Sequence, residues 1–170
     1  MSFTGREFWG VVHGMGFGAL FLLAFGGGIA GFYSLRQELL TAAGVRERMR
    51  RLRIGLLAMA VAAWGTVITG TWIVYPWYRD KAATSPRSQL LADPSTEQWH
   101  TFGMEWKEHV AWISPILATV VAFIALYYGV NLIKHERVRK TAMALFVLSF
   151  AIAAVAGGFG ALITKVAPIR

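Results

Sequence analysis

Residues 141–164, TAMALFVLSFAIAAVAGGFGALIT, form an apolar run that contains no acidic, basic or histidine side chain. A helix needs about 20 such residues to cross the hydrocarbon core of a bilayer. Backbone N–H and C=O groups in lipid must be satisfied within the segment, so this run predicts a membrane-spanning helix and not an open strand. Three further apolar runs of sufficient length occupy approximately residues 8–33, 54–78 and 110–133.

The polar stretches between these runs are too short to form a second domain. We therefore expect an all-α fold, with residues 1–170 forming one integral membrane domain whose helices follow one another up and down as a four-helix bundle. The expected helices are 8–33, 54–78, 106–133 and 141–164, and the expected outer loop is 79–105. The first run is too long for the core of a signal peptide and has no basic run before it, so we expect it to remain a membrane helix.

The composition agrees with this class and excludes others. Hydrophobic residues make up 56% of the chain and charged residues only 15%, yet the net charge is +8. A soluble domain has about 25% charged residues. The hydrophobicity excludes a disordered tail, and nucleic acid is not an expected partner, because a nucleic-acid module needs its basic residues on one soluble face. The chain has no cysteine, which excludes disulfides, iron–sulfur clusters and thiol chemistry.

The basic residues are concentrated in two of the three loops. Residues 34–53 contain six arginines and two glutamates, and residues 134–140 contain four basic residues and one glutamate. Residues 79–108 contain four basic and five acidic residues. The positive-inside rule places 34–53 and 134–140 in the cytoplasm, with both termini and the middle loop outside, and we expect the bacterial cytoplasmic membrane as the location. We interpret the clusters as topology signals, with anionic-lipid or regulatory binding as the alternative.

Two histidines are the strongest candidates for a functional site. His13 lies about a turn and a half into the first helix, and His109 lies at the start of the third. These two helices run parallel in an up-and-down bundle, so both side chains are expected near the outer face at a similar depth. Ionisable residues within membrane segments usually face the bundle interior and mark function. Two inward imidazoles on different helices predict axial ligation of one haem b iron, with His13 and His109 as the metal ligands.

Small, aromatic and basic residues near these histidines complete the predicted cofactor site. The additional candidate residues are Gly10, Gly14, Trp9, Trp106 and Arg79. The glycines form a stripe of spacing four beside His13, which suits either a flat ligand or close packing of helices. The two tryptophans share a helix face with His13 and His109, respectively, and are expected to wall the ring. The arginine lies near the outer surface and is a candidate partner for haem propionates.

On the strength of His13, His109 and the glycine stripe, the chain resembles small four-helix membrane b-type cytochromes, the hydrophobic haem-binding subunits of respiratory complexes. The resemblance covers the four-helix organisation. It implies a non-catalytic electron-transfer subunit of a respiratory or photosynthetic oxidoreductase complex, with the lipid bilayer, other membrane subunits or an outer-side electron carrier as partners. Many such cytochromes hold two haems on four histidines. This chain lacks the inner pair, so lateral electron transfer at the outer face is expected.

Two alternatives remain open at this point. Glu105 lies four residues before His109, and Glu108 is adjacent to it, so these groups are candidates for a quinone or metal site at the outer face. A carboxylate there can accept protons from a quinol. The other alternative is a cofactor-free structural or assembly subunit that packs against a larger membrane complex through its glycine-rich faces.

Overall fold

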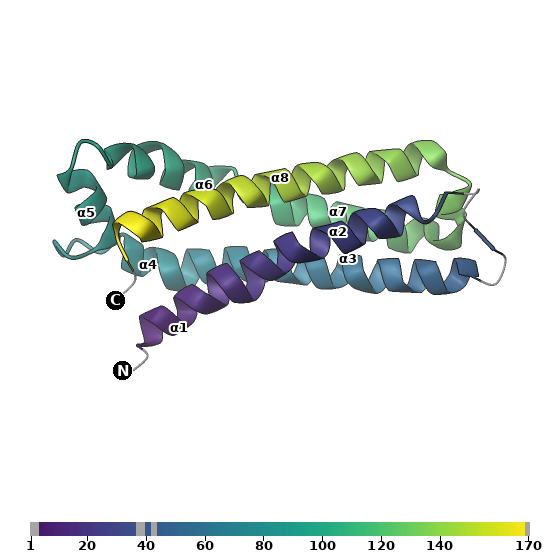
Figure 1. The fold of residues 1–170 in the computed structure, drawn as a ribbon, viewed down its shortest axis with the longest axis horizontal. Helices are drawn as coiled ribbons and strands as arrows, with labels where there is room; N and C mark the ends of the chain where they lie inside the picture. Colours follow the sequence, from purple (N-terminus) through teal and green to yellow (C-terminus); the bar gives the residue numbers. More distant parts are fainter. Residues whose placement is uncertain (1–3, 37–39, 42–43, 169–170) are drawn as a thin grey trace.

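The computed structural model describes residues 4–36, 40–41 and 44–168. Four long helical spans run alongside one another in a bundle, and the described residues contain no strand (Figure 1). The four spans are Gly5–Tyr33, Gly44–Tyr78, Trp99–Ile133 and Glu136–Val166. Each is long and apolar enough to cross a membrane. The predicted all-α bundle of four membrane-spanning helices is therefore confirmed.

Three of the four spans change helix type along their length. The first span consists of α1 (Gly5–Val11), the π-helical η1 (Val12–Ala19) and α2 (Leu20–Tyr33). The second consists of α3 (Gly44–Thr69), the π-helical η3 (Gly70–Val74) and α4 (Tyr75–Tyr78). The third consists of the π-helical η4 (Trp99–Met104), α6 (Glu105–His109), α7 (Ile113–Tyr128) and the 3₁₀-helical η5 (Gly129–Ile133). The fourth is α8 (Glu136–Val166), and α5 (Pro86–Ala92) lies in the loop between the second and third spans.

The helices extend beyond the apolar runs that indicate them. The second span begins at Gly44 and not at 54, because its arginine-rich first turns are also helical. Glu47 supports these turns through contacts with the arginines at i+3 and i+4, and its Oε1 lies 2.7 Å from Nε of Arg51. The loop predicted at 79–105 contains α5, which begins at a Ser85 N-cap followed by Pro86.

The core of the bundle lies where α2, α3, α7 and α8 meet. Phe32 and Phe146 are fully buried there. A Cβ atom at Gly28 would lie 2.5 Å from the ring of Phe146, so only a glycine allows α2 to pass so close to α8. Ser114 of α7 and Ser149 of α8 exchange hydrogen bonds, each Oγ donating to the other backbone carbonyl at 2.9 and 2.8 Å. Small residues and interhelical hydrogen bonds are the usual means of packing membrane helices.

The two ends of the bundle differ in composition. The tryptophan end carries the first and last described residues together with α4, α5, η4 and α6, and it includes Trp9, Trp77, Trp99 and Trp106 (Figure 1). The arginine end carries the start of α3, the end of α7 and the start of α8. The first span leans away from the other three towards its N-terminus (Figure 1). Only 11% of its most apolar window is buried, against 39% for the second span.

Arginines at the arginine end hold helix termini together. Arg53 of α3 donates from Nε to the Ala125 carbonyl at 3.2 Å and from Nη2 to the Leu126 carbonyl at 3.1 Å. These carbonyls lie in the last turn of α7, where the Ala125 carbonyl also accepts from the backbone N–H of Gly129. The chain then turns at Gly129, whose φ of 53° favours glycine. Arg139 is buried and donates to the Leu35 carbonyl at 2.9 Å. These basic residues therefore have structural contacts in addition to their role in the charge pattern.

Candidate functional site

His13 lies at the contact between the first and second spans. Its Nδ1 is 2.8 Å from the backbone carbonyl oxygen of Thr66 and 3.4 Å from Oγ1 of Thr69. A carbonyl oxygen can only accept, so Nδ1 carries the ring proton and Nε2 keeps its lone pair. Histidines that ligate metals commonly have the other ring nitrogen held in this way. The donor chemistry of His13 therefore fits an axial haem ligand.

Gly70 makes room for the His13 ring on the second span. A Cβ atom at this position would lie 2.7 Å from Cε1 of His13 and 3.2 Å from its Nδ1. Any larger residue would displace the ring from the Thr66 carbonyl. The orientation of the imidazole is therefore determined by a carbonyl on one side and by the bare backbone of η3 on the other.

His109 is the last residue of α6, and its Nδ1 is 2.8 Å from the backbone carbonyl oxygen of Glu105. Here too the carbonyl requires a proton on Nδ1 and leaves the lone pair on Nε2. The Glu105 carboxylate approaches the same nitrogen at 3.7 Å. The His109 side chain is 71% exposed, so its free nitrogen is accessible from outside the bundle.

The structure does not place His13 and His109 face to face. Lys107 extends from α6 towards α8, where a Cβ atom at Gly160 would meet its Nζ at 2.8 Å. Successive residues of an α-helix are about 100° apart, so His109, two residues later, points to the opposite side of α6. Residues 110–112 form a turn between α6 and α7.

The predicted glycine stripe does not act as one packed surface. Gly10 is half-buried, whereas Gly14 is exposed and a Cβ atom there would meet nothing within 4 Å. At Gly18, a Cβ atom would lie 3.3 Å from the carbonyl oxygen of His13. Gly14 therefore leaves open space beside the His13 segment, which suits a ligand or lipid better than a helix contact.

The two tryptophans of the predicted site pack against phenylalanines. Trp9 is 37% exposed and meets Phe8 edge-on, with ring centroids 5.4 Å apart. Trp106 meets Phe159 of α8 at 5.8 Å. Within the described part of the chain, neither indole ring is in contact with an imidazole. Trp106 anchors α6 to α8, and the placement of both tryptophans beside a haem ring stays a prediction.

Arg79 belongs to a polar cluster with Tyr75 and Glu108. Its Nη1 donates to the Tyr75 hydroxyl at 2.7 Å, and its guanidinium lies 5.4 Å from the centre of the same ring. The Tyr75 hydroxyl in turn donates to Oε2 of Glu108 in a short hydrogen bond. The other oxygen, Oε1 of Glu108, is buried and has no hydrogen-bond partner among the described residues. An unpaired buried acceptor is costly, so this oxygen is the group in the cluster best placed to bind a donor.

His100 is a buried residue that the sequence analysis did not select. Its Nε2 lies 3.3 Å from Nε of Arg87, a nitrogen that only donates, so Nδ1 carries the proton and donates to the Tyr78 hydroxyl at 2.9 Å. Both ring nitrogens are therefore engaged within the chain. The partners are 22 and 13 residues away in sequence, and the fold of α5 and η4 back onto α4 brings them together, so no local pattern indicates the cluster.

Three π-helical segments lie at the tryptophan end beside these histidines. His13 lies in η1, Gly70 is the first residue of η3, and His100 lies in η4. Short π-helical turns are rare and occur frequently at functional sites. Together with the unpaired Glu108 oxygen, they make this end of the bundle the candidate site. In the described part of the chain, no three His, Asp or Glu side chains are grouped as a metal site would require.

Comparison of the chain with models of protein families, with curated proteins and with solved structures finds no match. The resemblance to membrane b-type cytochromes that was drawn from His13, His109 and the glycine stripe therefore stays a prediction.

Proposed function

We propose that the chain is an electron-transfer subunit of a membrane complex and binds one haem b at the tryptophan end. The observation that supports this most directly is the hydrogen bond from Nδ1 of His13 to the Thr66 carbonyl. It leaves Nε2 available as a ligand on a residue that is half-buried between two spans. A bound haem would supply one-electron transfer.

The residues around His13 hold and tune the ligand. The Thr66 carbonyl fixes the ring tautomer, and Gly70 limits the tilt of the ring. Ligation of one iron by both His13 and His109 would require α6 to rotate and to give up the contact between Trp106 and Phe159.

We further propose that the tryptophan end faces outwards from a bacterial cytoplasmic membrane. The support for this orientation is the excess of arginine and lysine in 34–53 and 134–140, compared with the nearly balanced charge of 79–108. Electrons would then pass at the outer face between the site and a partner subunit or an outer carrier.

The test is the dithionite-reduced minus oxidised absorption spectrum of the purified protein. We expect a b-type α band that is abolished by His13→Ala and altered by His109→Ala. His135→Ala is the matched control, because this exposed histidine lies at the arginine end, and its spectrum should equal that of the unmodified chain. A colourless protein, or a band that survives His13→Ala unchanged, contradicts the proposal. If His109→Ala leaves the α band unchanged, His109 is not a ligand of the haem.

The unpaired oxygen of Glu108 favours a second candidate, a quinol-binding site at the same end. The acceptor Oε1 can receive a quinol hydroxyl while the Tyr75 hydroxyl, itself bonded by Arg79, holds Oε2 in place. Extraction of bound quinone tests this candidate. Glu108→Gln should lose the bound quinone, and Glu105→Gln, on an exposed carboxylate one turn earlier, should retain it. Equal quinone content in both variants would exclude Glu108 as the binding group.

A further inference from the structure

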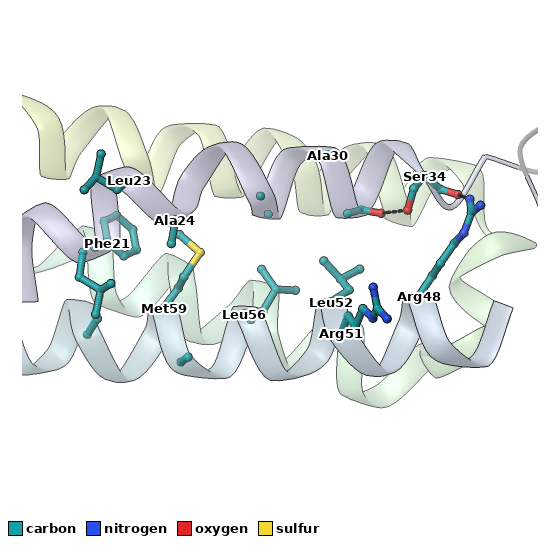
Figure 2. A pocket seen from close by; sticks show the side chains of 17 residues that line it. Phe21, Leu23, Ala24, Ala30, Ser34, Arg48, Arg51, Leu52, Leu56 and Met59 are labelled. Carbon is teal, nitrogen blue, oxygen red and sulfur yellow. Dashed lines mark hydrogen bonds between the residues drawn. The ribbon is translucent and has the colours of Figure 1, made fainter. Parts of the chain in front are cut away.

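A groove of about 640 Å³ runs between α2 and α3, away from the candidate site. Its walls come from one face of each helix, with Phe21 and Leu23 towards one end and Ser34, Arg48 and Arg51 at the other (Figure 2). Apart from this last group, the lining consists of aliphatic, aromatic and glycine residues. The groove is therefore apolar along most of its length and charged at one end only.

Glycines without close neighbours create the space. A Cβ atom at Gly27 of α2 or at Gly55 of α3 would meet nothing within 4 Å. By contrast, a Cβ atom at Gly31 would lie 3.0 Å from Cδ1 of Leu52, where the two helices touch. The helices are thus in contact at some positions and leave a channel at others. Helix packing accounts for Gly31 but not for Gly27 and Gly55.

The charged end carries several guanidinium groups. Arg48 reaches across the groove and donates from Nη1 to the Ser34 carbonyl at 3.0 Å (Figure 2). Arg51 is 78% exposed, and its Nε donates to Glu47 at 2.7 Å, a carboxylate shared with Arg50. The Nη groups of Arg51 have no partner within the described residues, and residues 46–53 hold five arginines against this single glutamate. An anion is therefore the expected occupant of this end.

The length of the groove matches one leaflet of a bilayer. Its lining on α2 extends from Leu20 to Ser34, about 21 Å at 1.5 Å per residue. The hydrocarbon core is about 30 Å thick, so one leaflet contributes about half of it and the interface the rest. Beyond Leu20 the two spans come into contact. There the Phe17 ring packs against α3 so closely that a Cβ atom at Gly65 would lie 2.8 Å from it. A partner helix would need a groove across the whole membrane, whereas a lipid needs only this half.

We propose that the groove between α2 and α3 binds an anionic phospholipid of the leaflet at the arginine end. The acyl chain lies along the open glycine positions, and the headgroup phosphate accepts hydrogen bonds from the free Nη groups of Arg51 beside Arg48. A guanidinium binds phosphate oxygens in a fork, which makes it more selective than a lysine at this place. This site is independent of the haem proposal, because it lies at the other end of the bundle.

The experiment measures lipid retention by native mass spectrometry of the full-length protein in detergent with added phosphatidylglycerol or phosphatidylcholine. We expect preferential retention of phosphatidylglycerol. Arg51→Gln should weaken it about fivefold, the effect of one basic residue at an anionic membrane surface. Arg50→Gln is the matched control, because Arg50 also pairs with Glu47 but does not line the groove, and it should leave retention unchanged.

A second pair of variants tests the apolar part of the groove. Gly27→Leu fills the channel and should reduce retention of both lipids, whereas Gly26→Leu, at an open position outside the groove, should not. Far-UV circular dichroism should show equal helix content in both. Equal retention of the two lipids, or equal effects within either pair of variants, overturns the proposal. A Gly27→Leu variant that loses a dimer instead of a lipid also overturns it, because the groove would then hold a second copy of the chain.

Discussion

The His13 imidazole packs against the bare backbone at Gly70, so a side chain introduced at position 70 should change the stability of the protein. Gly70→Ala would place a methyl group 2.7 Å from the ring, an overpacking that costs about 1–3 kcal/mol. Replacing glycine by alanine in a helix returns only about 0.5–1 kcal/mol. We therefore expect net destabilisation, measured as a lower free energy of unfolding in mixed detergent micelles.

Gly14→Ala is the control for this prediction, because nothing lies within 4 Å of its Cβ position. Here only the gain in helix propensity applies, so the free energy of unfolding should rise slightly. Both substitutions replace glycine by alanine, and we expect the free energy of unfolding to fall for Gly70→Ala and to rise for Gly14→Ala. If both variants change stability in the same direction, the ring is not held against η3 as described.

Individual residues show which parts of the candidate site can be predicted from the sequence. His13 was identifiable because a histidine in an apolar run is unusual, and its half-buried position between spans agrees with that reading. The exposure of His109 was not predictable, since a helical wheel for 106–133 assumes one continuous α-helix, whereas residues 110–112 interrupt it. The Tyr78–His100–Arg87 contacts could not be anticipated, because they depend on the folding of a 20-residue loop.

At the scale of the elements, the pairing of α7 with α8 leads to a quantitative prediction. Ser114 and Ser149 each donate to the backbone carbonyl of the other residue, so removing one hydroxyl leaves the other hydrogen bond intact. Hydrogen bonds between membrane helices contribute about 0.6 kcal/mol on average. Each single alanine variant should lose about this much, and the double variant about twice as much.

A double-mutant cycle of unfolding free energies checks this additivity. The two hydroxyls are also 3.2 Å apart, so a small coupling energy is compatible with the geometry. A double variant no less stable than either single variant would show that the two hydrogen bonds are not independent. Thr164→Ala removes a hydroxyl that bonds only within α8, and it should change the interhelical stability by less than either serine variant.

The elements differ from their sequence prediction mainly at their ends and at the π-helical segments. Apolar length predicted the four spans, because lipid imposes that length on any crossing helix. The arginine-rich start of α3 was expected as loop, since hydropathy does not register that arginine and glutamate are good helix formers. The prediction that glycines four residues apart form one stripe requires 3.6 residues per turn. Between Gly10 and Gly18 the chain is instead π-helical in η1, so this requirement is not met.

At the scale of the whole molecule, the orientation in the membrane can be tested directly. The chain contains no cysteine, so a single introduced cysteine reports its own side of the membrane. Ser95 and Thr41 are both exposed and lie in different loops. We expect Ser95→Cys to react with a membrane-impermeant maleimide in intact cells, and Thr41→Cys to react only after permeabilisation. The reverse pattern would invert the proposed orientation and place the candidate site inside.

Only a small part of the first span is buried, and this affects which forces determine its tilt in the membrane. Its backbone hydrogen bonds are internal, so α1 stays helical in lipid without support from the other spans. Two contacts connect this span to α3 near its middle, His13 with Thr66 and Phe17 with Gly65. Towards its N-terminus the span keeps a contact with the second span, where the Arg6 guanidinium lies 5.7 Å from the centre of the Trp77 ring. Because the first span has the least buried apolar window of the four, we expect its tilt to respond to hydrophobic mismatch with the bilayer. A thinner membrane would therefore incline the first span further.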